Sequence, residues 1–351
     1  MNHKAYQNIL VEGKLYNKEN ITELVSAETA DLYLFLQQWM DDSPEITVRT
    51  SGSTGIPKEI KVKKDATLIS AKQTLGYFGL KPGMTALLCL PVSYIAGKMM
   101  VVRAILGQLN MIAITPSANP LKDISSTIDF ASFTPMQILN GIRSKDANIK
   151  HLRKVIIGGG KVDKELNALL QDMPFEAFET YGMTETLSHI ALRRINGATR
   201  QEAFYPLEGV VLDKDARGCL SGYAEGITDK TLTTNDIAEF RSDGSFNIIG
   251  RIDNVINSGG IKHSPESIEK KIRHLLNVPF VISALPHKLF GLELVIVTEG
   301  RPSDSSSLLS AIGKELSRHE LPAAHIILQH FPKTESGKIK RAEIMKIISG
   351  A

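Results

Sequence analysis

Short apolar runs alternate with longer amphipathic segments from about residue 46 to residue 170. The strand-like runs are Ile46–Arg49, Glu59–Lys63, Ala86–Leu90, Met111–Ile114, Phe130–Phe133 and Lys154–Ile157. The helix-like segments between them are Ala66–Phe78, Ile95–Leu106, Met136–Ile142 and Lys164–Leu170. Asp65 is the expected N-cap of the first of these helices. Strands that alternate with helices predict an α/β fold with an open, mostly parallel sheet.

The pattern differs on either side of this region. The first 44 residues are expected to be helical, because apolar residues gather in Ala30–Met40. Between Ile190 and Ile249, short strand-like runs are separated by turns and predict a β-rich subdomain. From Ile252 onward a compact α+β domain is expected, with helices at Pro265–Leu276, Ser306–His319 and Arg341–Ile348 and strands at Phe280–Leu285, Glu293–Thr298 and His325–Leu328.

Composition narrows the class of protein. A chain of 351 residues suggests two domains, and 41 basic against 38 acidic residues give a net charge of +3. So balanced a charge gives no reason to expect nucleic acid as a partner. No apolar run approaches the roughly 20 residues of a membrane span, and the N-terminus lacks a signal-like apolar stretch. The two cysteines, Cys89 and Cys219, fit neither a disulfide framework nor a zinc site. We therefore expect a cytoplasmic protein without membrane insertion.

The segment Thr50–Lys58, T-S-G-S-T-G-I-P-K, is the first candidate for chemistry. Glycines let the backbone approach an anion, and backbone N–H groups, hydroxyls and Lys58 can surround phosphate oxygens. The spacing differs from that of P-loop ATPases. A Gly/Ser hairpin turn between two strands is the alternative interpretation.

The segment Tyr181–Thr186, Y-G-M-T-E-T, follows the strand-like run Phe175–Glu179. Thr184 could donate to a phosphate, and Glu185 could bind Mg²⁺, which prefers carboxylate oxygens together with substrate phosphates. The alternative is a helix start with a capping threonine.

Two further segments complete the set. Asp236 can accept from the two hydroxyls of a ribose, and Arg251 could hold a ribose or phosphate. Lys338 follows a Ser-Gly turn in the basic stretch Pro332–Arg341. An isolated aspartate is usually a cap or turn residue, and a basic stretch is usually a solvated surface. Four segments that can bind anions nevertheless occur in one chain, and their combination favours a nucleotide site over chance.

In this order, the four segments resemble the signature motifs of the adenylate-forming superfamily, which contains acyl-CoA synthetases, adenylation domains and luciferases. The resemblance implies an N-terminal domain, residues 1–252, that binds ATP and the acyl substrate, a mobile C-terminal domain, residues 254–351, and a hinge at Asp253. It implies a shortened N-terminal part. It implies that ATP is bound by Thr50, Ser51, Gly52, Ser53, Thr54, Gly55, Lys58, Gly158, Gly159, Gly160, Tyr181, Asp236 and Arg251. The implied catalytic residues are Lys338, Thr184 and Glu185, with Glu185 also the Mg²⁺ ligand, and Ser258, Gly259 and Gly260 would approach CoA. For Gly158–Gly160 an ordinary strand-to-helix turn is the alternative.

Leu90–Arg103, Ile156–Lys161 and Tyr181–His189 are more closely similar to the o-succinylbenzoate–CoA ligases of menaquinone synthesis. That resemblance implies an acyl pocket formed by Tyr94, Gly97, Lys98 and Arg103. Arg103 would pair with a second substrate carboxylate, and a surface arginine is the alternative. Tyr94 stands in place of a common histidine, Glu59 in place of a glycine, and Asn235 in place of the glycine before the ribose aspartate.

The resemblance implies small-molecule substrates: ATP with Mg²⁺, a carboxylic acid and CoA. It leaves a homodimer open. Two other functions remain: a ligase for another acid or for a carrier protein, and a non-catalytic nucleotide-binding relative. Intact Lys338, Glu185 and Asp236 disfavour the second of these.

Overall fold

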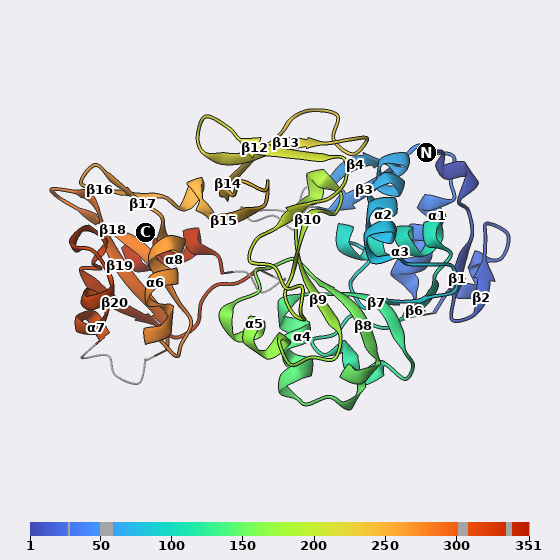
Figure 1. Cartoon of the computed structure of the whole chain (residues 1–351), viewed down its shortest axis with the longest axis horizontal. Coiled ribbons are helices and arrows are strands. Elements are labelled where there is room, and N and C mark those ends of the chain that lie inside the picture. Colours follow the sequence, from blue (N-terminus) through green and yellow to red (C-terminus); the bar gives the residue numbers. More distant parts are fainter. Residues whose placement is uncertain (27–28, 50–58, 301–307, 335–338, 351) are drawn as a thin grey trace. The chain divides into compact units, whose positions relative to one another are not determined.

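The computed structural model describes residues 1–26, 29–49, 59–300, 308–334 and 339–350 (Figure 1). The chain divides into two compact units. Unit 1 comprises Met1–Val211, Tyr223–Thr231 and Asp243–Ser245, and unit 2 comprises Leu212–Gly222, Leu232–Ser242 and Phe246–Ala351. The domain boundary expected at Asp253 stays a prediction, and each unit is described by itself.

A nine-stranded sheet is the centre of unit 1, with the order β11-β10-β9-β8-β7-β5-β6-β1-β2. The strands from β9 to β1 in this order are parallel to one another, while β10, β11 and β2 are antiparallel to their neighbours. Their bounds are β1 (Ile9–Val11), β2 (Lys14–Tyr16), β5 (Thr85–Leu88), β6 (Asn110–Ala113), β7 (Ile128–Phe133), β8 (Leu152–Ile157), β9 (Glu176–Gly182), β10 (His189–Arg194) and β11 (Tyr205–Pro206). This arrangement confirms the predicted mostly parallel α/β sheet. Strands β3 (Glu45–Arg49) and β4 (Glu59–Lys63) pair antiparallel in a separate two-stranded sheet.

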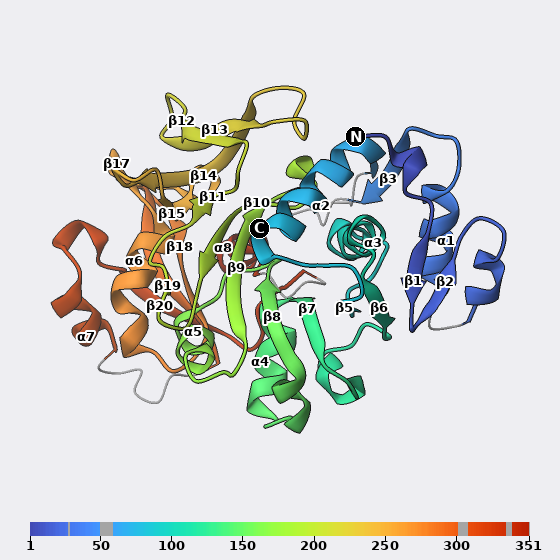
Figure 2. The same cartoon turned by 45° about the vertical axis from the view of Figure 1, so that its right-hand side comes forward.

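Helices cover both faces of this sheet, which explains why most residues of its central strands are apolar and buried. The helices of unit 1 are α1 (Ala30–Trp39), α2 (Lys64–Phe78), α3 (Ile95–Gly107), α4 (Pro135–Arg143) and α5 (Lys164–Leu170). On one face Phe78 of α2 packs against Phe130 and Phe178, with ring centroids 5.1 and 5.0 Å away. On the other face Ile138 of α4 and Leu166 of α5 belong to the core under β7 and β8 (Figure 2).

Two expectations for the N-terminal part are wrong. The first 44 residues are not mainly helical: β1 pairs in parallel with β6 and extends the sheet, and α1 is the only α-helix among the described residues of this segment. A three-residue strand has too short a pattern to be recognised without its partner. Asp65 is not an N-cap, because α2 begins at Lys64 and Asp65 lies in its first turn. Its carboxylate instead accepts from the backbone N–H of His3 (2.8 Å), which anchors the N-terminal segment.

Unit 2 contains the C-terminal α+β region that the sequence predicts and most of the predicted β-rich region. The start of the predicted β-rich region is wrong, because β10 and β11 extend the large sheet of unit 1. A four-stranded sheet runs in the order β12-β13-β14-β15, a hairpin joins β16 to β17, and a three-stranded sheet has the order β18-β19-β20. The strands are β12 (Val210–Lys214), β13 (Cys219–Ala224), β14 (Leu232–Phe240), β15 (Phe246–Arg251), β16 (Ile256–Ser258), β17 (Ile261–His263), β18 (Phe280–His287), β19 (Gly291–Glu299) and β20 (Ala324–Leu328). The end residues of β12 and β13 fall in unit 1.

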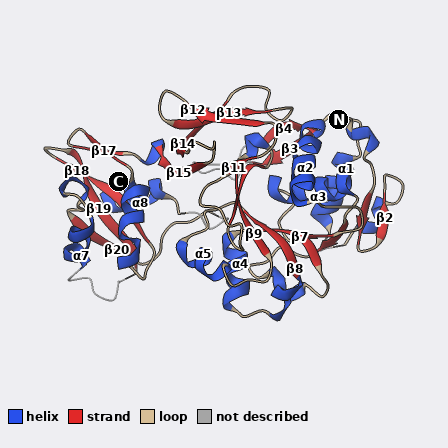
Figure 3. Ribbon diagram, in the orientation of Figure 1, coloured by secondary structure: helices blue, strands red, loops and turns tan. Residues whose placement is uncertain are grey.

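Helices pack on both sides of the three-stranded sheet (Figure 3). Ile268 of α6 (Pro265–Ile272) and Ile312 of α7 (Leu308–Glu315) share a core with Ile282 and Ile296. Ile344 of α8 (Arg341–Ser349) packs on the opposite face. Both α6 and α7 end about four residues before their predicted ends, because 3-10 turns follow them. No helix in the described ranges is long and apolar enough to cross a membrane.

Candidate functional site

Four chain segments leave the central sheet of unit 1 at the same edge, where the parallel strands β5, β7, β8 and β9 end. β5 lies between β6 and β7, so the chain reverses its direction of travel across the sheet at the β5–β7 boundary. Open α/β sheets bind ligands at such a switch point, beyond the carboxyl ends of the strands. The predicted segments around Tyr94, Gly158 and Thr184 all follow these strand ends.

The glycines after β8 are required by close packing. A Cβ on Gly158 would lie 2.5 Å from Thr180 Oγ1, and Gly159 has a φ of +75°, which side chains rarely adopt. The N–H of Gly158 donates to the carbonyl of Phe133 (3.0 Å), so this turn continues the ladder between β7 and β8. This geometry supports the turn interpretation, and the contact of Gly158–Gly160 with adenine stays a prediction.

The Y-G-M-T-E-T segment begins inside β9. The ring of Tyr181 lies 6.0 Å from that of Phe204, centroid to centroid. Thr184, Glu185 and Thr186 form a single 3-10 turn, so the segment is neither an extended loop nor the start of an α-helix. The next residue, Leu187, has a φ of +63°, an uncommon and costly conformation for leucine. The sequence prediction that Thr184 and Glu185 stand at a strand end is confirmed.

Glu185 is exposed and suits a metal that arrives with its own oxygen ligands. The described ranges contain no group of three or more His, Cys, Asp or Glu side chains that could hold a metal ion. Mg²⁺ is often bound by one or two carboxylates together with substrate phosphates. A single carboxylate at this edge therefore fits Mg²⁺ that enters as a complex with ATP.

Arg103 of α3 is almost completely buried, with 1% of its surface exposed. Its Nη2 donates to Ser188 Oγ (2.6 Å), and its Nη1 lies 3.5 Å from Met100 Sδ. Its Nε has no hydrogen-bond partner among the described residues. Burial lowers the pKa of Arg103 to about 9, which leaves the guanidinium charged at neutral pH. The alternative of a surface arginine is therefore wrong.

The other residues of the predicted acyl pocket have structural roles in this geometry. A Cβ on Gly97 would lie 2.3 Å from the carbonyl oxygen of Pro91, so the glycine lets α3 pack against the preceding turn. Lys98 is buried, with its Nζ 4.5 Å from the centre of the Phe35 ring, and Tyr94 is the N-cap residue of α3. Burial lowers the pKa of Lys98 to about 8. Contact of any of them with substrate stays a prediction.

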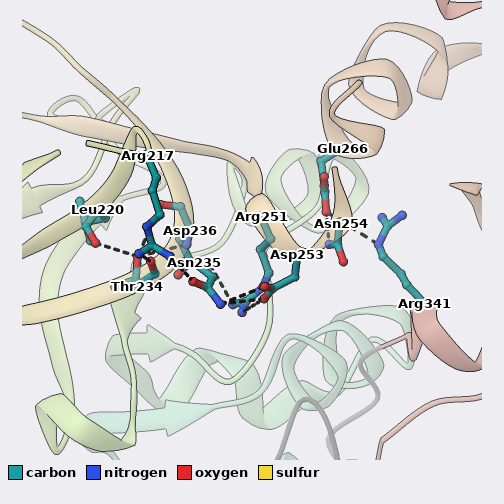
Figure 4. Close-up of polar contacts among 10 residues, drawn as sticks. All are labelled: Arg217, Leu220, Thr234, Asn235, Asp236, Arg251, Asp253, Asn254, Glu266 and Arg341. Carbon is teal, nitrogen blue, oxygen red and sulfur yellow. Dashed lines mark hydrogen bonds and ion pairs between the residues drawn. The ribbon is translucent and has the colours of Figure 1, made fainter. Parts of the chain in front are cut away.

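In unit 2, Asp236 and Arg251 face one another across β14 and β15 (Figure 4). Arg251 Nη1 donates to Asp236 Oδ1 and its Nη2 to Asp253 Oδ2, both at 2.9 Å. Asn235 Nδ2 also donates to Asp253, and its own Oδ1 accepts from Arg217 Nη1 (3.1 Å). The structure thus brings the predicted ribose residues and the predicted hinge residue into one hydrogen-bonded cluster.

The residues after Asp253 are fixed by a second set of contacts. Asn254 Nδ2 donates to Glu266, which lies 3.9 Å from Arg341 Nε. The predicted CoA segment Ser258–Gly260 forms the turn between β16 and β17. Gly259 and Gly260 have φ values of +59° and +84°, which explains the glycine pair.

Part of the predicted site lies outside the described residues: Thr50, Ser51, Gly52, Ser53, Thr54, Gly55, Lys58 and Lys338. Sequence reasoning also missed three residues that the structure connects to Arg103 in unit 1, Thr74, Ser188 and His189. It missed Arg217 as well, which contacts Asn235 in unit 2. Ser188 and His189 follow the Y-G-M-T-E-T motif directly, and this position was the only signal for them. Nothing in the local sequence distinguishes Thr74 or Arg217.

Comparison with known proteins identifies the family. The family model described as AMP-binding enzyme matches residues 21–215, more than half of the chain. The 2-succinylbenzoate–CoA ligase of Escherichia coli (strain K12) is 26% identical over 306 residues, which make up 83% of this chain and 66% of that ligase. This chain therefore spans about two thirds of the length of that relative.

Solved structures agree with this match. An acyl-CoA synthetase (AMP-forming)/AMP-acid ligase II-like protein from Dyadobacter fermentans DSM 18053 is 32% identical with a TM-score of 0.64, over 95% of this chain and 99% of that one. The o-succinylbenzoate coenzyme A synthetase from Bacillus subtilis, in complex with ATP and magnesium ion, has a TM-score of 0.73 at 17% identity, over 89% of this chain and 74% of that one, and shows the fold alone. The chain belongs to the AMP-binding enzyme family, that of the adenylate-forming acyl-CoA ligases, and it has their fold.

Proposed function

We propose that this protein is an ATP-dependent o-succinylbenzoate–CoA ligase. The substrate carboxylate attacks the α-phosphorus of ATP, forming acyl-AMP and releasing pyrophosphate. The thiol of CoA then attacks the acyl carbon, forming the thioester and releasing AMP. ATP and CoA are cytoplasmic metabolites, so we place this reaction in the cytoplasm.

The single observation that carries the choice of acid is Arg103. It is a buried guanidinium whose hydrogen-bond partners among the described residues are uncharged, and its Nε is unpaired. Burying a charge without an opposite charge is costly, and a carboxylate matches a guanidinium with two parallel hydrogen bonds. An acid with two carboxylates satisfies Arg103 with one and reacts with the other. The E. coli and B. subtilis relatives named above are ligases of such a diacid, which supports the same choice.

The other residues would act on charge and position. Attack of a carboxylate on ATP brings anions together, and Lys58 and Lys338 would offset that repulsion. Mg²⁺ held by Glu185 would neutralise phosphate charge, with Thr184 as a hydroxyl donor beside it. Asp236 and Arg251 would hold the ribose, and rotation of the C-terminal domain about Asp253 would replace Lys338 with Ser258–Gly260 for the CoA step.

Pyrophosphate release tests this proposal. The purified chain is incubated with ATP and Mg²⁺, first without acid, then with o-succinylbenzoate, and then with benzoate or a fatty acid. We expect release only with the diacid, and thioester only when CoA is added. The Lys338→Ala variant is the matched control, because it should stop acyl-AMP formation while still converting supplied acyl-AMP to thioester.

Two outcomes would overturn the proposal in different ways. Faster release with a mono-acid would make the protein a ligase for another acid. No release with any acid, although ATP binds, would favour a non-catalytic nucleotide-binding relative.

A further inference from the structure

A continuous series of polar contacts leads away from Arg103 into the interior of unit 1. Arg103 Nη2 lies 2.6 Å from Ser188 Oγ, and Ser188 Oγ lies 3.3 Å from His189 Nδ1. His189 Nε2 lies 3.3 Å from Thr74 Oγ1, which lies 3.2 Å from the carbonyl oxygen of Ser70. These residues come from α3, the start of β10 and α2, so three separate elements meet in this series.

The chemistry of the two ends fixes the direction of every hydrogen bond between them. A guanidinium only donates, so Ser188 Oγ must accept from Arg103. A carbonyl only accepts, so the Thr74 hydroxyl donates its proton to Ser70 and accepts from His189 Nε2. His189 therefore carries its proton on Nε2, and its Nδ1 accepts the proton of Ser188.

We propose that His189, as a neutral imidazole protonated on Nε2, is a positioning residue that makes Ser188 an acceptor for Arg103 and so orients the guanidinium toward the carboxylate of a bound diacid. This inference rests on the proposed function for the identity of the diacid. His189 acts through Ser188 and Arg103, and its position in the series requires no contact with substrate.

The environment of His189 supports the neutral form. Only 4% of the residue is exposed, and burial, with the charge of Arg103 as a second cause, holds the pKa of His189 well below its usual range. A protonated ring would donate from Nδ1 to Ser188, which would reverse this hydrogen bond and add a second positive charge beside Arg103. The Nε–H of Arg103 has no partner among the described residues and is a donor for an anion.

Thr74 offers the cleanest test, because its hydroxyl can be removed without changing its shape. Thr74→Val should raise the KM for o-succinylbenzoate about 5- to 10-fold, the loss expected for one hydrogen bond, and change kcat much less. Thr74→Ser keeps the hydroxyl and should restore the wild-type KM. Ser70→Ala is the matched control: the Ser70 side-chain oxygen has no partner among the described residues, and only the backbone carbonyl takes part. The KM for ATP should stay unchanged in all three variants.

The imidazole itself is tested by ¹⁵N NMR of histidine-labelled protein at pH 7, with the His189 signal identified by its loss in His189→Gln. We expect the spectrum of a neutral ring protonated on Nε2. A ring protonated on Nδ1, or on both nitrogens, would overturn the proposal even if the protein is active on another acid. If o-succinylbenzoate is the substrate but Thr74→Val has the wild-type KM, the positioning role fails while the proposed function stands. If only mono-acids react, the proposed function and the role toward a diacid both fail.

Discussion

Two arginines, the buried Arg103 of unit 1 and the partly buried Arg341 of unit 2, have opposite surroundings. Arg103 in unit 1 contacts a hydroxyl and a thioether sulfur, and burial lowers its pKa to about 9. Arg341 in unit 2 donates from Nη1 and Nη2 to the two carboxylate oxygens of Glu269, at 2.8 and 2.7 Å. Burial acts to lower the pKa of Arg341, but hydrogen bonds to Glu269 and its charge outweigh burial and raise that pKa.

This difference separates a structural cation from one that serves a ligand. Glu269 also accepts from the backbone N–H of Ile282 (2.7 Å), so the pair with Arg341 ties α8 and α6 to β18. Such a group is complete without any other molecule. Arg103 has an unpaired donor and no carboxylate partner among the described residues, so its charge is balanced only when an anion binds. Substituting each arginine with methionine, of similar length but without charge, tests this distinction.

The largest effect is expected at Arg341. Arg341→Met leaves the carboxylate of Glu269, itself 4% exposed, without its cation. Breaking a fully buried ion pair costs about 3–5 kcal/mol, and Arg341 keeps a quarter of its side-chain surface exposed, so the free energy of unfolding measured in urea should fall by about 2–3 kcal/mol. Adding Glu269→Leu should recover much of the loss, because the second change removes the unpaired charge. A loss under about 1 kcal/mol in the single variant would mean that Arg341 is not the structural cation that the geometry indicates.

The second effect is expected at Arg103, and on activity instead of stability. Arg103→Met should lower kcat/KM for o-succinylbenzoate by about 2–3 kcal/mol, as for a charge-assisted pair, and should leave ATP binding unchanged. The free energy of unfolding should stay the same or rise, since an unpaired buried charge is removed. Arg103→Lys should rescue activity only in part, because a point charge cannot make two parallel hydrogen bonds. A variant that unfolds more easily but keeps its kcat/KM would remove the contrast with Arg341.

Some elements of the fold can be predicted from the sequence and others cannot. The central strands of unit 1 are predictable because runs such as Val155–Ile157 are apolar at every position, and the three-stranded sheet of unit 2 is predictable from its flanking helices. Strand β1 is not, because three residues acquire their conformation from pairing with β6. The local pattern predicts Asp65 as a cap because its true partner, His3, is far away in the sequence.

The candidate site divides in the same way. Motif residues such as Asp236 and Arg251 can be found because their order along the chain is characteristic, and the structure brings them together. The sequence does not reveal the cross-strand register that aligns them. It also does not reveal the hydrogen bond from Asn235 to Asp253. Thr74 joins the Arg103 series only through tertiary packing, which no local pattern encodes.

Ligand binding should sharpen the comparison between the arginines. A molecule that binds only the folded state stabilises it by RT ln(1 + [L]/Kd), which is about 1.8 kcal/mol at about 20 times Kd. o-Succinylbenzoate at that concentration should therefore raise the melting temperature of the wild type, and of Arg341→Met measured from its own lower baseline. The same concentration should leave Arg103→Met unchanged. Equal shifts in all three proteins would show that the diacid does not use Arg103.

The smallest effect is expected at Lys98, a third buried cation, whose Nζ lies over the Phe35 ring. Burial lowers the pKa of Lys98 from 10.5 to about 8. Between those values the unfolded chain binds more protons than the folded one, so the contribution of Lys98 to stability increases with pH, and its destabilising effect is complete below pH 8. Lys98→Met should thus be more stable than wild type by about 1 kcal/mol at pH 7, since the contact with Phe35 offsets part of the burial cost. Urea unfolding at pH 7 and pH 9.5 measures this difference, which should shrink at the higher pH. A difference that is equal at both pH values would show that Lys98 keeps its ordinary pKa. Arg103 would then be the one cation of this helix whose pKa is lowered by burial.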